Sequence, residues 1–148
     1  MKTLLFLFVL TCMSVSLHAQ PHTVLTYNIR LDNPADGDDA WPKRRDYLAG
    51  QIRFYAPEVF GVQEALHHQL TYLADMLPEY AWVGGGRDDG KQAGEYSALF
   101  YQKDRFKAIS SGTFWLSETP DKPSKGWDAA LNRVCTYALL QDKKTLVL

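Results

Sequence analysis

Hydrophobic and polar residues alternate at the start of the sequence that follows the first twenty residues. Between Val24 and Arg30, the odd positions from Leu25 to Ile29 are apolar and the even positions are polar. Alternation with a period of two predicts a half-buried β-strand, because successive side chains of a strand point to opposite faces. We therefore expect one face of residues 24–30 to pack in a core and its polar face to look into a site.

Two longer segments have apolar residues at helical spacing. In the first, apolar positions 41, 48, 52 and 55 predict a helix that has Pro42 in its first turn and is ended by Pro57. In the second, the stripe Leu66, Leu70, Leu73 and Leu77 predicts a helix closed by Pro78. The apolar run 58–64 between them predicts a buried strand that ends in Gln63 and Glu64.

Beyond Tyr80 the pattern changes from helices to strands. Residues 84–90 form a glycine-rich loop, and strands are predicted at about 95–102, 106–116, 131–140 and from 143 onward, where the sequence stops. The acidic segment 32–39 lacks the ligand spacing of a calcium-binding loop and is expected to be a solvated loop. An α/β start that leads into consecutive strands favours a layered sandwich with antiparallel pairing.

Residues 1–20 differ from the rest and are predicted to be a cleavable signal peptide. Lys2 is followed by the apolar run Leu4–Leu10 and by a polar stretch with Ala19 at a plausible cleavage point. The run is too short for a transmembrane helix, and Cys12 is poorly placed for lipoprotein acylation. We expect a secreted or periplasmic domain of residues 21–148, without an internal disulfide, because Cys135 is then the only cysteine.

Composition limits the class of substrate. The chain is 46% hydrophobic and 22% charged, as expected of one globular domain. Its net charge of -1 does not favour a polymeric nucleic acid, which needs many basic residues to neutralise its phosphates. Smaller phosphate esters are therefore slightly preferred, although the substrate stays open.

The candidate chemistry lies at the ends of the first two predicted strands. Asn28 and Glu64 both occupy carboxyl ends of buried strands, where ligands collect in open α/β sheets. A carboxylate beside an amide suits Mg²⁺, which binds one or two carboxylates together with waters and substrate phosphate. For Glu64 the alternative is a favourable interaction with the helix that follows it, and for Asn28 a strand-end turn.

At these residues the sequence resembles a known family. The runs LTYNIR (25–30) and FGVQE (60–64) are similar to the opening motifs of the endonuclease/exonuclease/phosphatase superfamily. The runs GRDDG (86–90), FWLSETP (114–120) and GWDAA (126–130) look like those of a secreted bacterial subgroup. The resemblance implies a DNase I-like four-layer α/β/β/α sandwich, an α/β fold of which this chain holds an incomplete N-terminal part.

The resemblance also implies roles for five residues. Glu64 matches the glutamate that binds Mg²⁺ or Mn²⁺, and Asn28 matches an orienting asparagine. Arg87, Tyr96 and Arg133 are weaker matches to positions near the substrate phosphate. Arg30 stands where some members have a further metal-binding aspartate, so metal binding depends more heavily on Glu64.

The implied activity is metal-dependent hydrolysis of a phosphate ester, but several of the family's catalytic motifs are not in this sequence. Members also have a histidine, an Asp-x-Asn motif and a late Asp-His pair, and His22, His67 and His68 match none of them. We hypothesise that the chain alone is inactive. The alternatives are a noncatalytic binding module and a gene fragment that continues downstream. Trp115 and Trp127 are expected to pack or, second to that, to form a wall of the substrate site, and His67 and His68 to lie on a polar helix surface.

Overall fold

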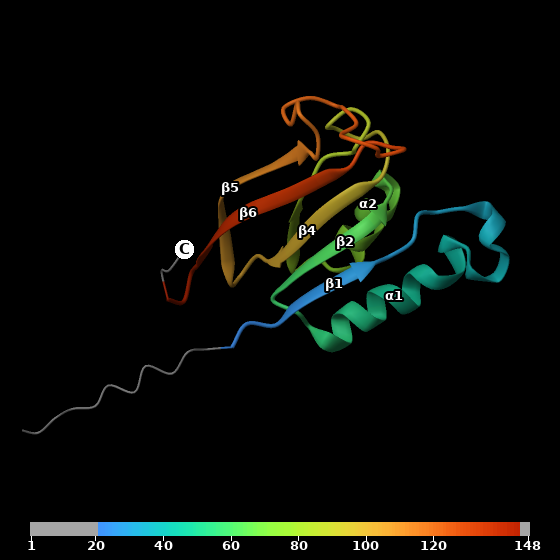
Figure 1. Cartoon of the computed structure of the whole chain (residues 1–148). Coiled ribbons are helices and arrows are strands. Elements are labelled where there is room, and N and C mark those ends of the chain that lie inside the picture. The colour runs from blue at the N-terminus through green and yellow to red at the C-terminus, as the bar shows by residue number, and fades with distance from the viewer. Residues whose placement is uncertain (1–20, 146–148) are drawn as a thin grey trace, which may run out of the picture.

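The computed structural model describes residues 21–145, so the predicted signal peptide and the last three residues lie outside the described residues. The elements are β1 (Val24–Asn28), a 3₁₀ helix (Pro34–Asp39), α1 (Trp41–Tyr55), β2 (Val59–Ala65), α2 (His67–Met76), β3 (Tyr80–Val83), β4 (Tyr96–Gln102), β5 (Phe106–Trp115) and β6 (Val134–Asp142), as Figure 1 shows. In residues 21–145 no helix is long and apolar enough to cross a membrane.

The strands form two sheets. In the first, the strand order is β1-β2-β4-β3, with β1 parallel to β2 and β4 antiparallel to both of its neighbours. The second sheet is the antiparallel pair of β5 and β6. The parallel pair comes from the strand-helix-strand start, since a parallel connection needs a crossover. The later antiparallel pairs, β3 with β4 and β5 with β6, are joined by the loops 84–95 and 116–133.

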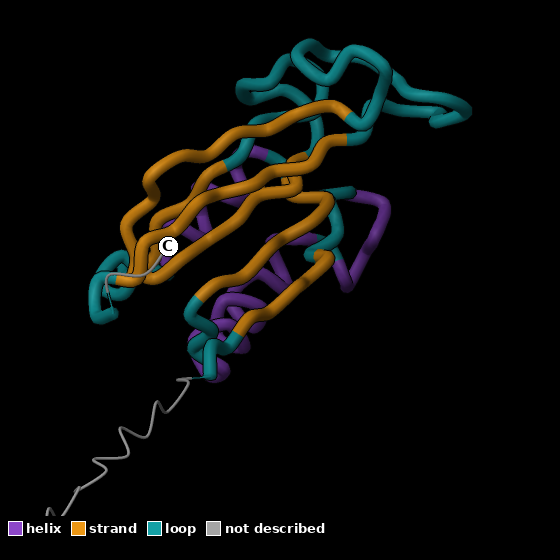
Figure 2. The backbone as a smooth tube through the Cα atoms, turned by 60° about the vertical axis from the view of Figure 1, so that its left-hand side comes forward, coloured by secondary structure: helices purple, strands orange, loops and turns teal. Residues whose placement is uncertain are grey.

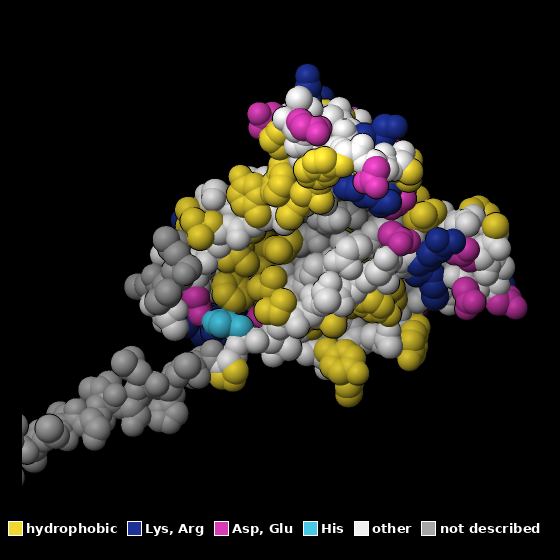
Figure 3. Space-filling model, in the orientation of Figure 1, with side chains coloured by type: hydrophobic (Ala, Val, Ile, Leu, Met, Phe, Trp, Pro, Cys, Tyr) yellow, Lys and Arg dark blue, Asp and Glu magenta, His cyan; other side chains and the backbone are white. Residues whose placement is uncertain are grey.

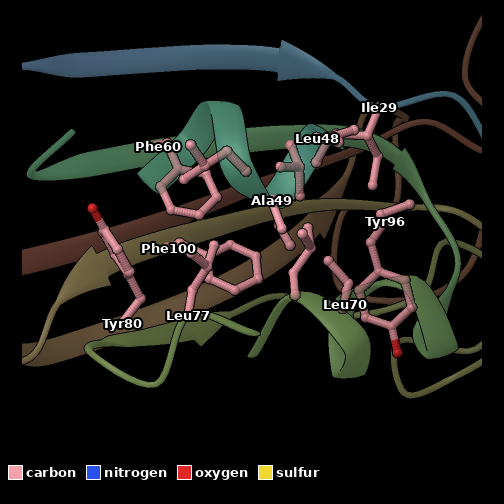
Figure 4. Close-up of a cluster of buried hydrophobic side chains, with 14 of the residues drawn as sticks. Ile29, Leu48, Ala49, Phe60, Leu70, Leu77, Tyr80, Tyr96 and Phe100 are labelled. Atoms are coloured by element: carbon pink, nitrogen blue, oxygen red, sulfur yellow. The ribbon is translucent and has the colours of Figure 1, made fainter. Parts of the chain in front are cut away.

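Helices α1 and α2 cover one face of the first sheet and enclose the main core with it. Phe60 of β2 and Phe100 of β4 are register partners, and their rings stack with centroids 4.6 Å apart. Figure 4 shows these rings beside Leu48, Leu70 and Leu77 from the helix side. Each of these fully buried side chains contributes roughly 1.5–3 kcal/mol relative to exposure, so this layer fixes the carboxyl ends of β1 and β2.

The second sheet lies beside the first, with β6 next to β4 (Figures 1 and 2). The described residues thus provide a helical layer and two sheet layers, and they include no helix over the outer face of the second sheet. Apolar side chains gather over the β5 and β6 region in Figure 3. On these strands Ile109, Tyr137 and Leu139 are all more than two-fifths exposed. This arrangement is the incomplete α/β/β/α sandwich that the sequence predicted.

A buried arginine connects the two sheets. The Arg105 guanidinium donates to Oδ2 of Asp142 at 3.0 and 2.8 Å and to Oε1 of Glu58 at 2.7 Å. Glu58 precedes β2 and Asp142 ends β6, so one side chain joins the start of a strand in the first sheet to the end of a strand in the second. The hydrogen bonds from Arg105 lower the pKa of the Asp142 carboxyl to about 2.

Most predicted elements are confirmed, with small changes of boundary. Three details were wrong: β3 was not predicted, Tyr55 at the end of α1 is exposed, and residues 143–145 form a turn where a strand was expected. The acidic segment 32–39 contains a 3₁₀ helix, which Asn33 caps by accepting from the Ala35 amide. Tyr55 is exposed because it is the last residue of α1, directly before the left-handed Ala56 ends the helix, whereas Ile52 of the same turn is fully buried.

Candidate metal and phosphate site

Glu64 lies in a β-bulge at the end of β2. The register between β2 and β4 shifts between Gln63 and Ala65, which leaves Glu64 without a cross-strand partner. Its φ is 61°, in the left-handed region that non-glycine residues rarely adopt. A bulge re-aims a side chain, and a strained backbone of this kind concentrates at functional sites.

Asn28 holds one oxygen of that carboxylate. Its Nδ2 donates to Oε1 of Glu64 at 2.8 Å, while its Oδ1 accepts from the Arg30 amide at 2.9 Å. The second bond fixes which way the amide faces, so the donor is directed at Glu64. Within residues 21–145, Oε2 of Glu64 has no hydrogen-bond partner. The sequence predicted this pair, and the structure brings it together.

Gln69 fixes the loop that follows β1, a role that the sequence analysis missed. Its fully buried side-chain oxygen accepts from the amides of Asp32 and Leu66, each at 3.0 Å, and its nitrogen donates to the Arg30 carbonyl at 3.0 Å. The loop after β1 is thereby tied to the start of α2. These two segments directly follow Asn28 and Glu64 in the chain, so their connection fixes both residues. A polar residue next to the apolar position 70 of a helix stripe is the only signal that could have indicated it.

A cavity of about 310 Å³ opens beside the Asn28–Glu64 pair. Its walls come from β1, from the β2 bulge, from the loop before β4 and from the segment before β6: Asn28, Gln63, Glu64, Arg87, Glu95, Tyr96, Ser97, Leu116, Asn132, Arg133 and Val134. All five predicted site residues therefore line one cavity. Glu95 and Asn132 also line it and were not predicted to, although each directly precedes a predicted site residue, Tyr96 or Arg133.

Arg87 is largely buried and is paired with an acidic neighbour. Its guanidinium lies 2.9 Å from Oε2 of Glu95, and 13% of its side chain is exposed. Its backbone carbonyl accepts from Nε1 of Trp115 at 2.7 Å and from Nδ2 of Asn132 at 3.1 Å. Its Nε is buried and has no hydrogen-bond partner in the described part of the chain. Its Nε also lies 3.8 Å from Oδ1 of Asp88. Arg87 therefore joins the glycine-rich loop to the base of the loop before β6 and fixes one wall of the cavity.

Arg133 is the more accessible cation. It is exposed, it precedes the first residue of β6, and its carbonyl accepts from the Leu116 amide at 2.8 Å. No ion pair within residues 21–145 includes it. A guanidinium with no acidic partner at the rim of a cavity is available for bidentate pairing with a phosphate.

The Tyr96 ring points to the other side of the sheet. Tyr96, Ala98 and Phe100 alternate along β4 and are buried in the core that the helices cover. The Tyr96 hydroxyl donates to the Lys91 carbonyl at 2.5 Å and lies 3.1 Å from Nδ1 of His67. Burial raises its pKa, so the hydroxyl stays protonated. Its phosphate contact stays a prediction, and its observed bonds serve to hold the glycine-rich loop.

His67 is not a polar surface residue, and that expectation was wrong. It is half-buried, lies 6.0 Å from the Tyr96 ring and 6.3 Å from the Trp82 ring, and packs because the helix begins directly behind β4. His68 is exposed as expected, with Nε2 2.9 Å from Oδ2 of Asp32.

Trp115 and Trp127 also differ from each other in burial. Trp115 is buried and packs as expected, whereas Trp127 is 77% exposed, so the expectation of packing is wrong for Trp127. The loop that carries Trp127 has no element above it within residues 21–145.

Arg30, which replaces a possible second metal ligand, is paired with Asp36. Its guanidinium donates to both carboxylate oxygens of Asp36, at 3.1 and 3.0 Å. This pairing raises the pKa of Arg30 and lowers that of Asp36. Both residues line a second cavity of about 520 Å³ on the other side of Asn28. Arg30 thus contributes to the wall of that cavity and supplies no carboxylate beside Glu64.

The donor set at this site fits a hard divalent cation that is only partly held by protein. Glu64 offers one oxygen that is not hydrogen-bonded, and Asn28 fixes the other. Residues 21–145 contain no group of three His, Cys, Asp or Glu side chains that could hold a metal ion. Mg²⁺ is often bound through one or two carboxylates, with waters and phosphate completing its shell. Glu64 at an open cavity, where the other carboxylate, Glu95, is paired with Arg87, agrees with this mode of binding.

A mixed sheet with a carboxylate and an arginine-lined cavity at the ends of its strands is an arrangement of the DNase I-like fold. Solved structures share it. An endonuclease/exonuclease/phosphatase from Bacteroides vulgatus is 47% identical, with a TM-score of 0.80, over 82% of this chain and 47% of its own. A family protein from Bacteroides thetaiotaomicron is 45% identical, with a TM-score of 0.81, over 84% of this chain and 47% of its own.

A third similar structure is a mannosyl-6-phosphatase from Bacteroides thetaiotaomicron, 45% identical, with a TM-score of 0.81, over 85% of this chain and 48% of its own. Neither a protein-family model nor a curated protein matches the chain. The chain belongs to the endonuclease/exonuclease/phosphatase superfamily. It spans about half the length of these relatives, which fits the N-terminal portion that the sequence predicted.

Proposed function

We propose that this chain supplies the metal-binding part of a divalent-metal-dependent phosphoesterase that acts on a small phosphate ester. The observation that carries the proposal is the Asn28–Glu64 pair, which lines one cavity together with the unpaired cation Arg133. A carboxylate for a cation and a guanidinium for a phosphate are the two charges that phosphate-ester hydrolysis needs.

The residues of this chain have distinct parts in the proposal. Mg²⁺ or Mn²⁺, when bound, would neutralise charge on the phosphoryl oxygens and activate a water. Glu64 would hold the cation through Oε2, and Asn28 would keep the carboxylate oriented. Arg133 would pair with the phosphate. Arg87, already paired with Glu95, would keep the cavity wall beside the phosphate in place.

Two observations support a phosphorylated sugar as the substrate. A structure 45% identical to this chain is a mannosyl-6-phosphatase. The net charge of -1 provides no broad basic surface for a nucleic acid. The signal-like pattern of residues 1–20 supports export, so we propose that the substrate is met outside the cytoplasm.

The metal site can be tested without turnover. We expect Mn²⁺ to broaden the NMR signals of residues 28, 63–65 and 133 in purified residues 21–148, and excess Mg²⁺ to reverse the broadening. Glu64→Gln should abolish this effect. Glu118→Gln is the matched control, because it removes the same charge from an exposed position on a neighbouring loop. Equal broadening in wild type and Glu64→Gln would overturn the assignment.

The same protein distinguishes an enzyme part from a noncatalytic binding module. The specific observation that favours a module is that residues 21–145 contain no group of three His, Cys, Asp or Glu side chains that could hold a metal ion. In either case we expect no phosphatase turnover by residues 21–148 alone. Isothermal titration of phosphate with Mg²⁺ then separates the two, since phosphate binding that ignores Glu64→Ala supports the module. Robust metal-dependent turnover would contradict the expected inactivity.

A further inference from the structure

The loop between β5 and β6 presents one exposed aromatic side chain. Trp127 is 77% exposed, the highest value among the large apolar residues of this loop, where Leu116 and Leu131 are 42% and 48% exposed. Figure 1 places this loop, drawn in orange, with the glycine-rich loop at the end of the sheets where β1 and β2 terminate. Both ends of the loop, at Leu116 and at Asn132–Arg133, line the cavity beside Glu64.

The backbone at Trp127 is strained. The Ala129 amide donates to the Gly126 carbonyl at 3.0 Å, which closes a β-turn with Trp127 as its second residue. The φ of Trp127 is 50°, a region where glycine, asparagine and aspartate are favoured and a bulky side chain is an outlier. Since Trp127 is also exposed, packing does not compensate for this strain, which points to a role in binding.

The loop is nevertheless fixed in place. The Leu116 amide donates to the Arg133 carbonyl at 2.8 Å, and the hydroxyls of Ser117 and Ser124 lie 2.6 Å apart. Ser124 also donates to the Lys122 carbonyl at 2.9 Å. A Cβ at Gly126 would collide with the Leu116 carbonyl oxygen, so the turn lies directly on the start of the loop. The indole is therefore presented by a rigid support and not by a loose tip.

We propose that Trp127 is a stacking platform for the pyranose ring of a phosphorylated sugar whose phosphate occupies the Glu64 cavity. This inference rests on the proposed function and names the residue that would hold the sugar ring. A pyranose has an apolar C–H face that matches an indole face, and a rigid exposed aromatic binds such a ring at little entropic cost. The mixed charges of the surrounding loop, Glu118, Asp121, Lys122, Lys125 and Asp128, give no basic track for a nucleic-acid backbone.

Three variants separate binding from folding. Trp127→Asn removes the ring and suits the left-handed backbone, so its melting temperature should equal or exceed that of wild type. Trp127→Phe keeps a ring, and Leu131→Ala removes another exposed apolar side chain of the same loop. A clear fall in the melting temperature of Trp127→Asn would show that Trp127 packs, and would overturn the proposal.

The probes are inorganic phosphate, methyl mannoside 6-phosphate and adenosine 5′-monophosphate, each titrated with Mg²⁺ into residues 21–148. We expect wild type to bind the sugar phosphate about five- to tenfold more tightly than phosphate, an advantage typical of one aromatic contact. Trp127→Asn should lose that advantage without changed affinity for phosphate, and Trp127→Phe and Leu131→Ala should keep most of it.

A second readout locates the ring itself. In protein labelled with 5-fluorotryptophan, the ¹⁹F signal of Trp127 should shift with the sugar phosphate and not with phosphate alone. Equal affinity for phosphate and sugar phosphate would overturn the platform alone. The same gain with adenosine 5′-monophosphate would overturn the sugar assignment. Absence of any binding would overturn the proposed function, and the platform with it.

Discussion

The side-chain nitrogen of Asn28 donates to Oε1 of Glu64 at 2.8 Å, although the two residues lie 36 positions apart in the sequence. This hydrogen bond links the ends of the parallel strands β1 and β2. Asn28 is itself fixed, because its oxygen accepts from the Arg30 amide. One carboxylate oxygen is thus held by protein and the other is left for a ligand. This division of roles gives the first prediction.

Asn28→Ala should weaken Mg²⁺ binding about tenfold, since one hydrogen bond to a charged group contributes roughly 1.5 kcal/mol. The carboxylate would remain but would sample more orientations. Isothermal titration measures the affinity. Thr26→Ala is the control, because Thr26 lies on the same side of β1 and bonds Gln63 instead of Glu64. Unchanged affinity in Asn28→Ala would show that Glu64 is oriented by its backbone alone.

Glu64→Asn should separate stability from metal binding. With φ at 61°, Glu64 carries a strain of roughly 1 kcal/mol that asparagine tolerates better. We expect the free energy of unfolding in urea to stay level or rise by up to about 1 kcal/mol, with Mg²⁺ binding lost. Glu64→Val, β-branched and unsuited to positive φ, should be less stable than wild type. A marked loss of stability in Glu64→Asn would instead indicate a structural role for the carboxylate.

Gln69→Leu should destabilise the protein by about 3 kcal/mol. The change keeps the volume of the side chain but removes three hydrogen bonds, and it leaves the amides of Asp32 and Leu66 and the carbonyl of Arg30 without a partner. Urea unfolding gives the value. Thr71→Ala, an exposed position on the same helix, should change stability by less than about 0.5 kcal/mol. A small effect of Gln69→Leu would mean that water replaces the lost partners.

The sequence was sufficient for what depends on local pattern. Alternation in 24–30 and helical spacing in 41–55 predicted β1 and α1, and strand ends placed Asn28 and Glu64 together. The alternation of side chains along β4 was also sufficient to predict that the Tyr96 ring points into the core, because Tyr96 lies on the same side of the strand as the core residue Phe100. The burial of Tyr96 could therefore have been predicted from the sequence, but it was not.

Other features depend on contacts that no local pattern records. The bulge at Glu64 is a mismatch of register between β2 and β4, strands separated by 30 residues along the chain. Gln69 reads as an ordinary polar helix residue until the loop after β1 folds over it. The exposure of Trp127 follows from a turn in which a tryptophan occupies a position typical of glycine or asparagine. Each is a tertiary effect that overrides residue propensity.

The ion pair between the sheets should make stability depend on acid pH. Because hydrogen bonds from Arg105 lower the pKa of Asp142 to about 2, Asp142 stabilises the fold above the unfolded pKa of about 3.9. That contribution falls as pH falls from about 4 to about 2, when the folded carboxyl becomes protonated. Asp142→Asn should therefore melt at a lower temperature than wild type at pH 7, and the difference should shrink across this window. A difference that is constant with pH would assign the effect to packing.

Tyr96→Phe tests whether the hydroxyl serves the substrate or the loop. The hydroxyl is bonded to the Lys91 carbonyl and to His67, on the side of the sheet away from the Asn28–Glu64 pair. Removing it should cost about 0.5–1.5 kcal/mol of stability, because one hydrogen bond is lost while the Lys91 carbonyl still accepts from the Gly86 amide. It should also speed amide hydrogen exchange at Gly86 and Asp88, whose amides donate to Lys91 and Ala93. Affinity for phosphate in the presence of Mg²⁺ should stay within about twofold of wild type, since the ring and the cavity walls are kept.

His67→Phe is the companion variant, because it removes the second partner of the hydroxyl while it keeps an aromatic ring beside Trp82. It should give a smaller loss of stability and the same phosphate affinity. A tenfold loss of phosphate affinity in Tyr96→Phe, with stability and hydrogen exchange unchanged, would place the hydroxyl on the substrate instead.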